Sequence, residues 1–407
     1  MDKAKENIIK FGRAMLDLGF QNTHSGNISL RVGDEFYITK TGSMLGHLEE
    51  SDVVLPGLYE PLTGLFQASS ETGTHRLILQ RSAAVNHAHT FSTTLLSFFM
   101  EEISPVDLLG RKHLGIVPVV EFEIPIGSKE MDEKIPAILA DHPAMVVKTH
   151  GPFIRGDSLN QAFYFLNLLE YSSEILLNLK NLAIGYADAE APGSPELPAY
   201  EPPRAGKATR DLELISQFKR TSSDLFRMKI SPFHTGSISV ADGKEMYYSP
   251  CASTPDYMEN EIQRVSINEE DQDYFKRLHQ AVYNYTSAQS AIFTHTSQAM
   301  VEAYKAADRG EASFIPVDAE GGFLYPAIPI VSPADAVRSI VEKASRYKMV
   351  VILGLGALAV GHTLGDTSHH SSSLNNICFL KTQLDHMEKS GVVENTDDYL
   401  FKKGKDW

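Results

Sequence analysis

Hydrophobic positions recur at helical spacing near the start of the chain and alternate with polar ones soon afterwards. Residues 4–19 carry apolar side chains three and four positions apart, which predicts an amphipathic helix. From Ile28 the pattern alternates as in a strand, and Gly33-Asp34 predicts a hairpin turn into a second strand at 35–39. The first forty residues therefore predict a helix followed by a β-hairpin.

The remainder of the first half mixes helical and strand patterns. We expect helices near 71–80, 91–100 and 129–140, and a long apolar helix that opens at Ser158-Leu159 and runs to about residue 181. We expect strands through His87 and His89, within 115–123, and along the apolar run that ends at His150. This mixture predicts an α/β fold.

A proline-rich stretch at residues 191–206 interrupts the pattern. It contains five prolines, which favour a stiff, extended linker. A chain of 407 residues also exceeds what one hydrophobic core usually serves. We therefore expect a first domain at 1–190, a linker at 191–206 and a second domain at 207–407.

Charge and cysteine content limit the kinds of binding partner and the cellular compartment that we expect for this protein. The formal net charge of −15 argues against nucleic acid, because binding to phosphate backbones needs a basic face. Cys251 and Cys378 are not in a metal-type spacing, which favours a reducing, cytoplasmic setting. The first residues lack the apolar core of a signal peptide, and no apolar run reaches the ~20 residues that span a bilayer. We therefore expect no membrane partner.

The candidate chemistry centres on two histidines, His87 and His89. Side chains at i and i+2 leave the same face of a strand, roughly 6–7 Å apart. Glu71 lies upstream in Ser-Ser-Glu, and His150 follows the apolar run 144–147. Three histidines and a carboxylate from separate elements are a common zinc ligand set.

The second half repeats the first weakly. Segments around His234, Tyr247, His295, Gly356 and Ser373 echo those around His24, Tyr37, His89, Gly151 and Ser158. The chemistry has changed, because the positions of the first half's Glu71, His87, His150 and Asn27 are taken by Phe275, Phe293, Leu355 and Ser237. His295 remains, and one histidine does not hold a catalytic zinc ion. We interpret this as a duplication with an altered second copy.

Each candidate residue also has a structural explanation. Ser70 is a typical helix N-cap, and Asn27 and Thr41-Gly42 are typical of turns. His150 alone would suit a hydrogen-bonded core position, and we interpret His75 as structural. We expect His369-His370 to lie in an exposed, serine-rich loop. Only the joint occurrence of the motifs favours the functional interpretation.

The ordered motifs of the first half resemble those of the class II aldolase/adducin family, typified by L-fuculose-1-phosphate aldolase. In chain order they are Ser-Gly-Asn-Ile-Ser from residue 25, Thr41-Gly42 after a strand, Ser-Ser-Glu ending at Glu71, His-x-His ending at His89, and His150-Gly151. The resemblance implies two tandem three-layer α/β/α domains, each with a mixed, mostly antiparallel sheet. In the second half it extends to the fold alone.

The resemblance also implies roles for individual residues. Zinc would be held by His87, His89 and His150, and Glu71 would ligate the metal or act as the base. The family's phosphate pocket corresponds to Asn27, Thr41, Gly42, Ser69 and Ser70, and His24 stands where the family has a threonine. The implied reaction is cleavage or formation of a phosphorylated ketose, from dihydroxyacetone phosphate and an aldehyde, through a metal-stabilised enediolate.

One departure concerns the proton donor. The family's aldolases take a tyrosine from a neighbouring subunit, in the segment after His-x-His. Residues 104–113 contain no tyrosine, whereas their counterpart in the second half carries Glu320 and Tyr325. Because family members form four-fold rings, we expect a homodimer of tandem chains that imitates such a ring, with the second domain supplying the acid.

Two other functions stay open. A sugar-phosphate dehydratase or epimerase would use the same fold, although family epimerases tend to carry aspartate where this chain has Glu71. A non-catalytic, adducin-like scaffold would have lost the zinc ligands, which the first half keeps.

Overall fold

The computed structural model describes residues 2–22, 24–58, 67–186, 194–200, 209, 211–231, 236–249, 262–269 and 271–399. The chain divides into two compact units. The first comprises Met1–Pro105 and Gly110–Glu174, and the second comprises Val106–Leu109 and Ile175–Trp407.

The helices and strands of the first half follow the predicted order. They are α1 (Lys3–Asp17), β1 (Asn27–Val32), β2 (Glu35–Thr39), β3 (Val53–Val54), α2 (Thr72–Ile78), β4 (Ala84–His87), α3 (Phe91–Ser97), β5 (Glu102–Ile103), α4 (Leu108–His113), β6 (Val117–Val120), α5 (Lys129–Asp141), β7 (Ala144–Val147), β8 (Gly151–Gly156) and α6 (Leu159–Leu182). Two short 3₁₀ helices, Leu45–His47 and Glu50–Asp52, lie between β2 and β3.

The strands of the first unit form one mixed sheet. Within the described residues it has eight strands in the order β3-β2-β1-β4-β8-β7-β6-β5. Only β6 and β7 run parallel among these neighbours, and the other pairs are antiparallel. The order places β4 between β1 and β8, at the centre of the sheet.

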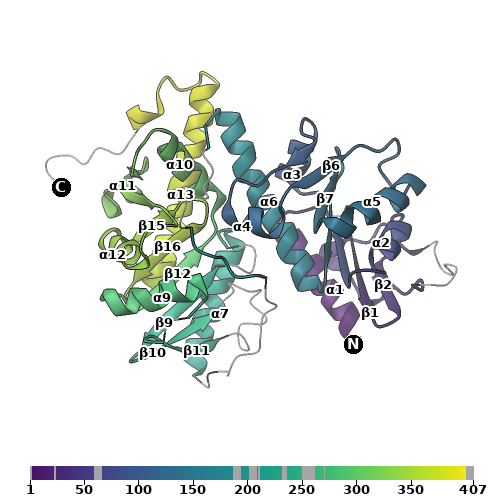
Figure 1. Cartoon of the computed structure of the whole chain (residues 1–407), viewed down its shortest axis with the longest axis horizontal. Helices are drawn as coiled ribbons and strands as arrows, with labels where there is room; N and C mark the ends of the chain where they lie inside the picture. The colour runs from purple at the N-terminus through teal and green to yellow at the C-terminus, as the bar shows by residue number, and fades with distance from the viewer. Residues whose placement is uncertain are drawn as a thin grey trace. The chain divides into compact units, whose positions relative to one another are not determined.

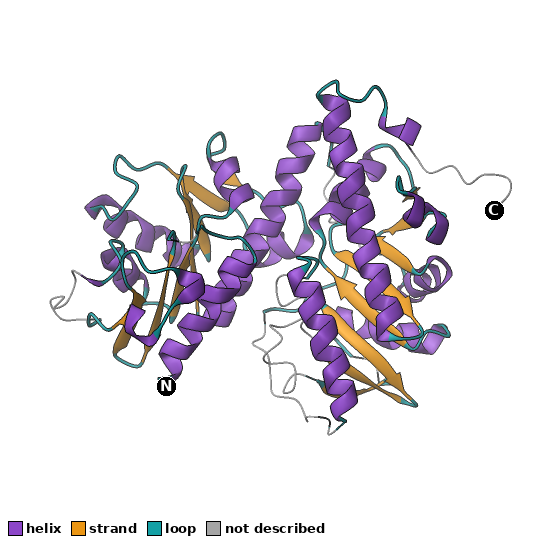
Figure 2. Ribbon diagram, turned by 180° about the vertical axis from the view of Figure 1, so that it is seen from behind, coloured by secondary structure: helices purple, strands orange, loops and turns teal. Residues whose placement is uncertain are grey.

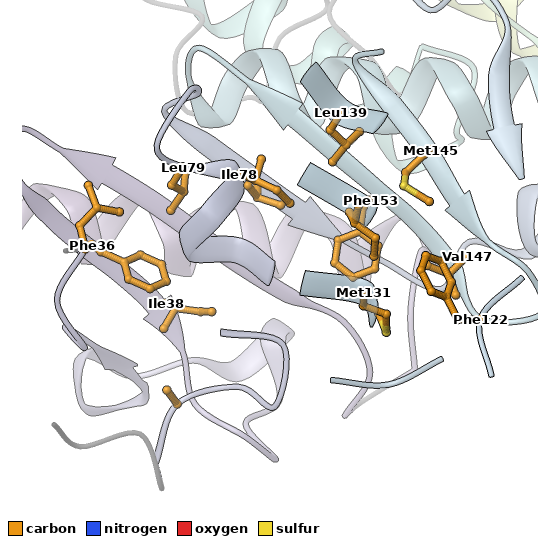
Figure 3. Close-up of a cluster of buried hydrophobic side chains, with 14 residues drawn as sticks. Phe36, Ile38, Ile78, Leu79, Phe122, Met131, Leu139, Met145, Val147 and Phe153 are labelled. Atoms are coloured by element: carbon orange, nitrogen blue, oxygen red, sulfur yellow. The ribbon is translucent and has the colours of Figure 1, made fainter. Parts of the chain in front are cut away.

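Helices cover both faces of this sheet (Figures 1 and 2). On one face α2 and α5 pack on the strands through the cluster drawn in Figure 3: Phe36, Ile38, Leu58, Ala68, Ile78, Leu79, Val85, Phe122, Met131, Ile135, Leu139, Met145, Val147 and Phe153. Burying each large apolar side chain stabilises the fold by about 1.5–3 kcal/mol. On the other face α1 and α6 meet, where the ring centroids of Phe11 and Phe163 lie 5.2 Å apart. The unit therefore has three layers.

The second half repeats this order of elements. They are α7 (Leu212–Arg227), β9 (Ser237–Asp242), β10 (Glu245–Ser249), β11 (Gln263–Ser266), α9 (Tyr274–Tyr285), β12 (Ser290–Thr294), α10 (Ser297–Asp308), β13 (Ser313–Phe314), α11 (Ala319–Leu324), β14 (Ile328–Val331), α12 (Val337–Tyr347), β15 (Met349–Ile352), β16 (Gly356–Gly361), α13 (Leu364–Lys389) and a 3₁₀ turn at Thr396–Tyr399. Their sheet, β11-β10-β9-β12-β16-β15-β14-β13, matches the first strand for strand.

Two expectations about the second half are wrong. His369-His370 lie inside α13, not in a loop, and the Nδ1 atom of His370 lies 2.8 Å from the Tyr325 hydroxyl. The counterpart of Ser158-Leu159 is Thr363-Leu364, because α6 and α13 both begin three residues after the final glycine of β8 or β16. Residues 232–235, part of the segment that echoes His24, lie outside the described residues, as does Cys251.

Within the described part of the chain, no helix is both long enough and apolar enough to cross a membrane. Of the expected linker at 191–206, residues 194–200 are described and form neither helix nor strand.

Candidate metal centre

The three predicted histidine ligands come from adjacent strand ends of the first sheet. His87 is the last residue of β4, where it pairs with Asn27 of β1 and Phe153 of β8. His89 follows two residues later, beyond the end of the strand. His150 ends the tight turn between β7 and β8, and the next residue begins β8. The sheet order therefore brings together residues that are sixty positions apart in sequence.

The three imidazoles converge on one point. One ring nitrogen from each histidine lies within 4.8 Å of the other two. The ring centroids of His87 and His89 are 5.1 Å apart, and each lies 4.7 Å from that of His150. The Nε2 atoms of His87 and His150 are 3.3 Å apart. This spacing matches the ~3.3 Å expected between two nitrogens on a tetrahedral zinc ion with bonds of about 2.0–2.1 Å.

Backbone contacts and burial prepare His87 as a ligand. Its Nδ1 lies 2.9 Å from the carbonyl oxygen of Pro152, which fixes the ring and leaves Nε2 facing the other histidines. Burial and the neighbouring imidazoles hold the pKa of His87 well below its usual value. Burial likewise lowers the pKa of His89 to about 4 and lowers that of His150. All three rings are thus neutral at pH 7, the form that binds a metal.

Glu71 lies beside this cluster. Its Oε2 is 3.7 Å from Nε2 of His87 and accepts a 2.7 Å hydrogen bond from Nδ2 of Asn27. Burial raises the pKa of Glu71 to about 7, and the bond from Asn27 opposes that rise. A carboxyl group with a pKa near neutrality can both take and return a proton.

These residues fit a zinc ion. Three neutral imidazoles with converging nitrogens are a typical donor set for a catalytic zinc site, which leaves a coordination position open. In addition, Oε1 of Glu71 is buried and has no hydrogen-bond partner among the described residues. A buried carboxylate oxygen without a partner is costly unless a ligand or an ion satisfies it.

The turn that presents His150 has an unusual backbone. Thr149 adopts a left-handed conformation with φ of 64°, which costs energy in a residue other than glycine. Gly151 has φ of 152°, and a Cβ atom there would lie 2.1 Å from the carbonyl oxygen of Ala88. Glycine is therefore required at 151 so that β8 can approach the segment that carries His89.

The candidate phosphate residues lie on two neighbouring loops. The amide of Ser69 donates to the Thr39 carbonyl, and the amide of Thr41 donates to the Gln67 carbonyl. Ser69 is buried and accepts from Asn27, whereas Ser70 is exposed. The Thr41 hydroxyl donates to the carbonyl oxygen of Ala68 at 2.7 Å.

The helix that follows these loops does not begin at Ser70. The N-cap of α2 is Glu71, which makes no side-chain cap bond, so the alternative that Ser70 caps this helix is wrong. Gly42 has φ of 75° and open space where a Cβ would stand, as expected where a backbone must stay accessible. His24 is exposed, in a turn whose amides donate to Asn22.

The second unit has an aromatic cluster in the corresponding place. Phe293 pairs with Ser237 on β9 as His87 pairs with Asn27 on β1. The ring of Phe293 lies 5.0 Å from that of Phe275 and 5.2 Å from that of His295. Of the three converging imidazoles of the first unit, the second keeps one, His295, and has Phe293 and buried Leu355 at the positions of His87 and His150.

The two candidate acids of the second half differ in environment. Glu320 is exposed in the first turn of α11. Tyr325 is buried, and its hydroxyl lies 2.8 Å from Nδ1 of His370. Burial also raises the pKa of Tyr325. Both residues belong to the second unit, whereas the three histidines belong to the first.

One residue near the site was not foreseen from the sequence. Glu170 of α6 accepts hydrogen bonds from the backbone amides of Ser92 and Thr93 at 2.7 and 3.0 Å and from the Thr93 hydroxyl at 2.8 Å. Glu170 therefore accepts hydrogen bonds from backbone amides in the first turn of α3, the helix that follows His89 directly. The available signal was weak, because Glu170 is one of two acids, with Glu174, in a largely apolar helix.

Known proteins are similar to both halves of the chain. The family model "Class II Aldolase and Adducin N-terminal domain" matches residues 6–177 and 217–382. The chain is 30% identical over 183 residues to the L-fuculose phosphate aldolase of Methanocaldococcus jannaschii, covering 43% of this chain and 97% of that one. It is 28% identical over 197 residues to the 3-oxo-tetronate 4-phosphate decarboxylase of Escherichia coli K12, covering 46% and 91%.

A third relative and a solved structure extend the comparison. The methylthioribulose-1-phosphate dehydratase of Microcystis aeruginosa is 26% identical over 193 residues, covering 42% of this chain and 93% of the relative. The crystal structure of the l-fuculose-1-phosphate aldolase of Thermus thermophilus matches with 28% identity and a TM-score of 0.42, covering 44% and 95%. The two family matches together span most of the chain. The chain therefore belongs to the class II aldolase and adducin family and carries two tandem copies of its domain.

Proposed function

We propose that the first domain is a zinc-dependent aldolase that cleaves or forms a phosphorylated ketose. The observation that carries this proposal is the convergence of His87, His89 and His150 beside the buried carboxyl group of Glu71. A similar L-fuculose phosphate aldolase supports the substrate class. The proline-rich residues 191–206 lie between the two family matches, which supports our proposed domain boundary.

The roles follow from the chemistry of the side chains. The three histidines would hold the zinc ion, which when bound would act as a Lewis acid on the substrate's oxygens. Glu71 removes and returns the proton at the carbon next to the carbonyl group. Its pKa of about 7 suits it to act as both base and acid near neutral pH. Asn27 holds the Glu71 carboxyl group in place.

We assign phosphate binding to Asn27, Thr41, Gly42, Ser69 and Ser70. The Thr39–Ser69 and Thr41–Gln67 backbone hydrogen bonds keep the two loops adjacent. Hydroxyl and amide donors at this position would bind an anion without a lysine or arginine. Ser70 is exposed, which is consistent with contact to a ligand.

We further propose that the acid comes from the second domain and that two chains associate as a homodimer. Between Glu320 and Tyr325, exposure favours Glu320, because the Tyr325 hydroxyl is engaged by His370. The cytoplasmic setting remains a prediction based on the two cysteines.

Metal analysis of the purified protein tests the proposal. We expect about one zinc ion per chain, bound by the first unit alone. His89→Ala should abolish binding, and the matched variant His295→Ala should retain it, because the second unit lacks the other ligands. Absence of stoichiometric metal from the wild-type chain, or its retention in His89→Ala, would contradict the proposal.

A substrate screen then separates the possible reactions. Ketose phosphates are incubated with the zinc-loaded protein and assayed for dihydroxyacetone phosphate. Release of this product identifies an aldolase. Loss of water or a change of configuration without cleavage of a carbon–carbon bond would instead identify the dehydratase or epimerase alternative. A chain that binds no zinc and acts on none of them would favour the scaffold alternative.

A further inference from the structure

A histidine on α2 is buried with a hydrogen bond at only one end of its ring. His75 lies one helical turn after Glu71, and its side chain is fully buried. Its Nδ1 atom lies 2.7 Å from the hydroxyl of Ser29 on β1. Its Nε2 atom has no hydrogen-bond partner among the described residues. A buried polar atom without a partner is costly, so we expect a partner for Nε2 close by.

The second unit shows the direction in which this atom points. There Nδ1 and Nε2 of His279 lie 2.5 and 2.8 Å from the hydroxyls of Ser239 and Ser237. The two serines occupy the places of Ser29 and Asn27, as the pairing of β9 with β12 and of β1 with β4 shows. The buried histidine of the first unit makes the same contact through Nδ1. Its Nε2 atom therefore faces Asn27.

The side chain of Asn27 has the complementary unpaired atom. Its amide nitrogen donates to Oε2 of Glu71 at 2.7 Å and to Oγ of Ser69 at 3.0 Å. Its carbonyl oxygen, Oδ1, is buried and has no partner in the part of the chain that the structure describes. Because an imidazole N–H is a donor and an amide oxygen is an acceptor, a small side-chain adjustment lets the two unpaired atoms satisfy each other.

The neighbouring serine determines which nitrogen of His75 carries the proton. Burial lowers the pKa of His75 to about 3, so its ring is neutral at pH 7 and has a single N–H group. The described residues offer the hydroxyl proton of Ser29 no acceptor other than Nδ1 of His75. Ser29 therefore donates to Nδ1. The ring proton lies on Nε2, the atom that faces Asn27.

We propose that His75 is a positioning residue whose Nε2–H group donates to Oδ1 of Asn27 and thereby keeps the amide nitrogen directed at Glu71. A side-chain amide has a donor end and an acceptor end. The reverse orientation would set the amide oxygen against the carboxylate of Glu71 and the amide nitrogen against the N–H of His75. The hydrogen bond from His75 excludes that orientation, so the carboxyl group beside His87 keeps its donor.

The residues of the second unit agree with this role. A serine hydroxyl can donate or accept, so Ser237 satisfies His279 without directing any further group. Phe275 stands in the place of Glu71 there, and it has no carboxyl group to orient. The directional amide thus occurs in the unit that has the glutamate. The effect on turnover rests on the proposed function, whereas the hydrogen bond itself does not.

Nuclear magnetic resonance of the purified full chain tests the hydrogen bond. Long-range proton–nitrogen correlation spectra of protein with isotope-labelled histidine distinguish the two neutral tautomers of each ring. We expect the Nε2–H tautomer for His75, assigned by the loss of its signals in His75→Phe and by their shift in Asn27→Ser. An Nδ1–H tautomer, or His75 signals that Asn27→Ser leaves unchanged, would overturn the proposal.

Kinetics of the zinc-loaded chain test the positioning role. His75→Phe keeps a ring in the buried position and removes the donor. We expect kcat to fall about tenfold, KM to stay within about twofold of the wild-type value and zinc content to stay unchanged. The matched control is His279→Phe, which removes the same two ring nitrogens from the second unit and should leave kcat unchanged. A wild-type kcat in His75→Phe would overturn the positioning role.

A double-mutant cycle separates positioning from general destabilisation. Asn27→Ser reproduces the serine–histidine arrangement of the second unit but removes the donor to Glu71, so kcat should fall about tenfold or more. Adding His75→Phe to this variant should cause no further loss of kcat, because His75 acts through the amide of Asn27. Losses that multiply in the double variant would overturn the positioning role. If no substrate is found and the proposed function fails, the tautomer of His75 still decides whether the hydrogen bond to Asn27 exists.

Discussion

The side-chain amide of Asn27 is hydrogen-bonded to the carboxyl group of Glu71, with 2.7 Å between Nδ2 and Oε2. The same amide nitrogen lies 3.0 Å from Oγ of Ser69. Asn27 therefore joins β1 to the segment that leads into α2, and it fixes the orientation of the carboxyl group beside His87. The second unit has serine at this position and phenylalanine in place of the glutamate.

Replacing Asn27 should impair turnover more than metal binding. Asn27→Ala removes the only hydrogen bond to Glu71 Oε2 that the described residues provide, and bonds to charged groups contribute about 1.5–3 kcal/mol. We expect kcat/KM to fall about ten- to a hundredfold for the substrate found in the screen. Zinc content, measured by elemental analysis, should stay near one per chain.

A second buried asparagine provides the control for this substitution. Asn167 of α6 donates to the carbonyl oxygen of Phe163 at 2.6 Å and makes no contact with Glu71. Asn167→Ala should lower Tm and leave kcat/KM unchanged. Full activity in Asn27→Ala would show that Glu71 needs no support from this amide.

Glu170 should support both stability and zinc affinity. Glu170→Ala leaves the amides of Ser92 and Thr93 without their acceptor, and each unsatisfied buried group costs about 1–3 kcal/mol. Because α3 follows His89 directly, we also expect zinc affinity to fall about 10–100-fold, as for other groups that orient metal ligands. Competition with a chromogenic chelator measures the affinity.

The second unit supplies the comparison for Glu170. Asn375 of α13 holds the equivalent position and accepts one bond, from the Thr296 hydroxyl at 2.7 Å. Asn375→Ala should lower Tm slightly and leave zinc affinity unchanged. Equal zinc affinity in Glu170→Ala and the wild-type chain would mean that α3 does not orient His89.

The elements and the proximity of His87 to His89 were predictable because they depend on local patterns. Alternation identified the strands, and the His-x-His spacing placed two rings on one side of a strand end. Glu170 could not be found in this way, since its partners Ser92 and Thr93 lie 78 and 77 positions away in sequence. Its role depends on how α6 packs, which no local pattern records.

The errors in the second half have a related cause. The serine- and histidine-rich residues of α13 have weak helix propensity, yet Thr367, Ser371 and Leu374 of this helix are buried. Tertiary packing therefore overrides the local preference. The Ser373-Leu374 pair was matched to Ser158-Leu159 by residue identity, whereas the end of β16 shows that Thr363-Leu364 is the true counterpart.

A buried histidine in the second unit should make stability depend on pH. His279 lies between the hydroxyls of Ser237 and Ser239, 2.8 and 2.5 Å from Nε2 and Nδ1, and burial lowers its pKa to about 3. An unfolded histidine has a pKa of about 6.5, so between pH 6.5 and 3 the unfolded state binds more protons. The contribution of His279 to the free energy of unfolding should therefore be at its full value above pH 6.5 and should decrease as the pH falls towards 3.

Calorimetry across this pH range measures the effect. His279→Gln should be less stable at pH 7, because it loses the fit to both serines, and its Tm should decline less between pH 6.5 and 4 than that of the wild-type chain. An exposed histidine, His24, provides the control, since His24→Gln should preserve the wild-type slope. Parallel Tm profiles for His279→Gln and the wild-type chain would contradict the assignment.

β8 approaches the segment that carries His89 so closely that only glycine fits at position 151. Gly151 has φ of 152°, and a Cβ added there would lie 2.1 Å from the carbonyl oxygen of Ala88 and 3.4 Å from Cα of His89. Gly151→Ala must therefore move His89 away from His150. We expect a stability loss of about 1–3 kcal/mol from overpacking and zinc affinity at least about tenfold weaker.

Gly356→Ala is the control that distinguishes a loss of zinc affinity from a loss of stability. Gly356 is the first residue of β16, as Gly151 is of β8, and an added Cβ would lie 2.5 Å from the carbonyl oxygen of Thr294. Gly356→Ala should therefore destabilise the second unit by a similar amount, while zinc affinity stays at the wild-type value because Phe293 and Leu355 occupy the ligand positions there. If Gly151→Ala bound zinc as tightly as Gly356→Ala, the spacing between β8 and His89 would not control the geometry of the metal centre.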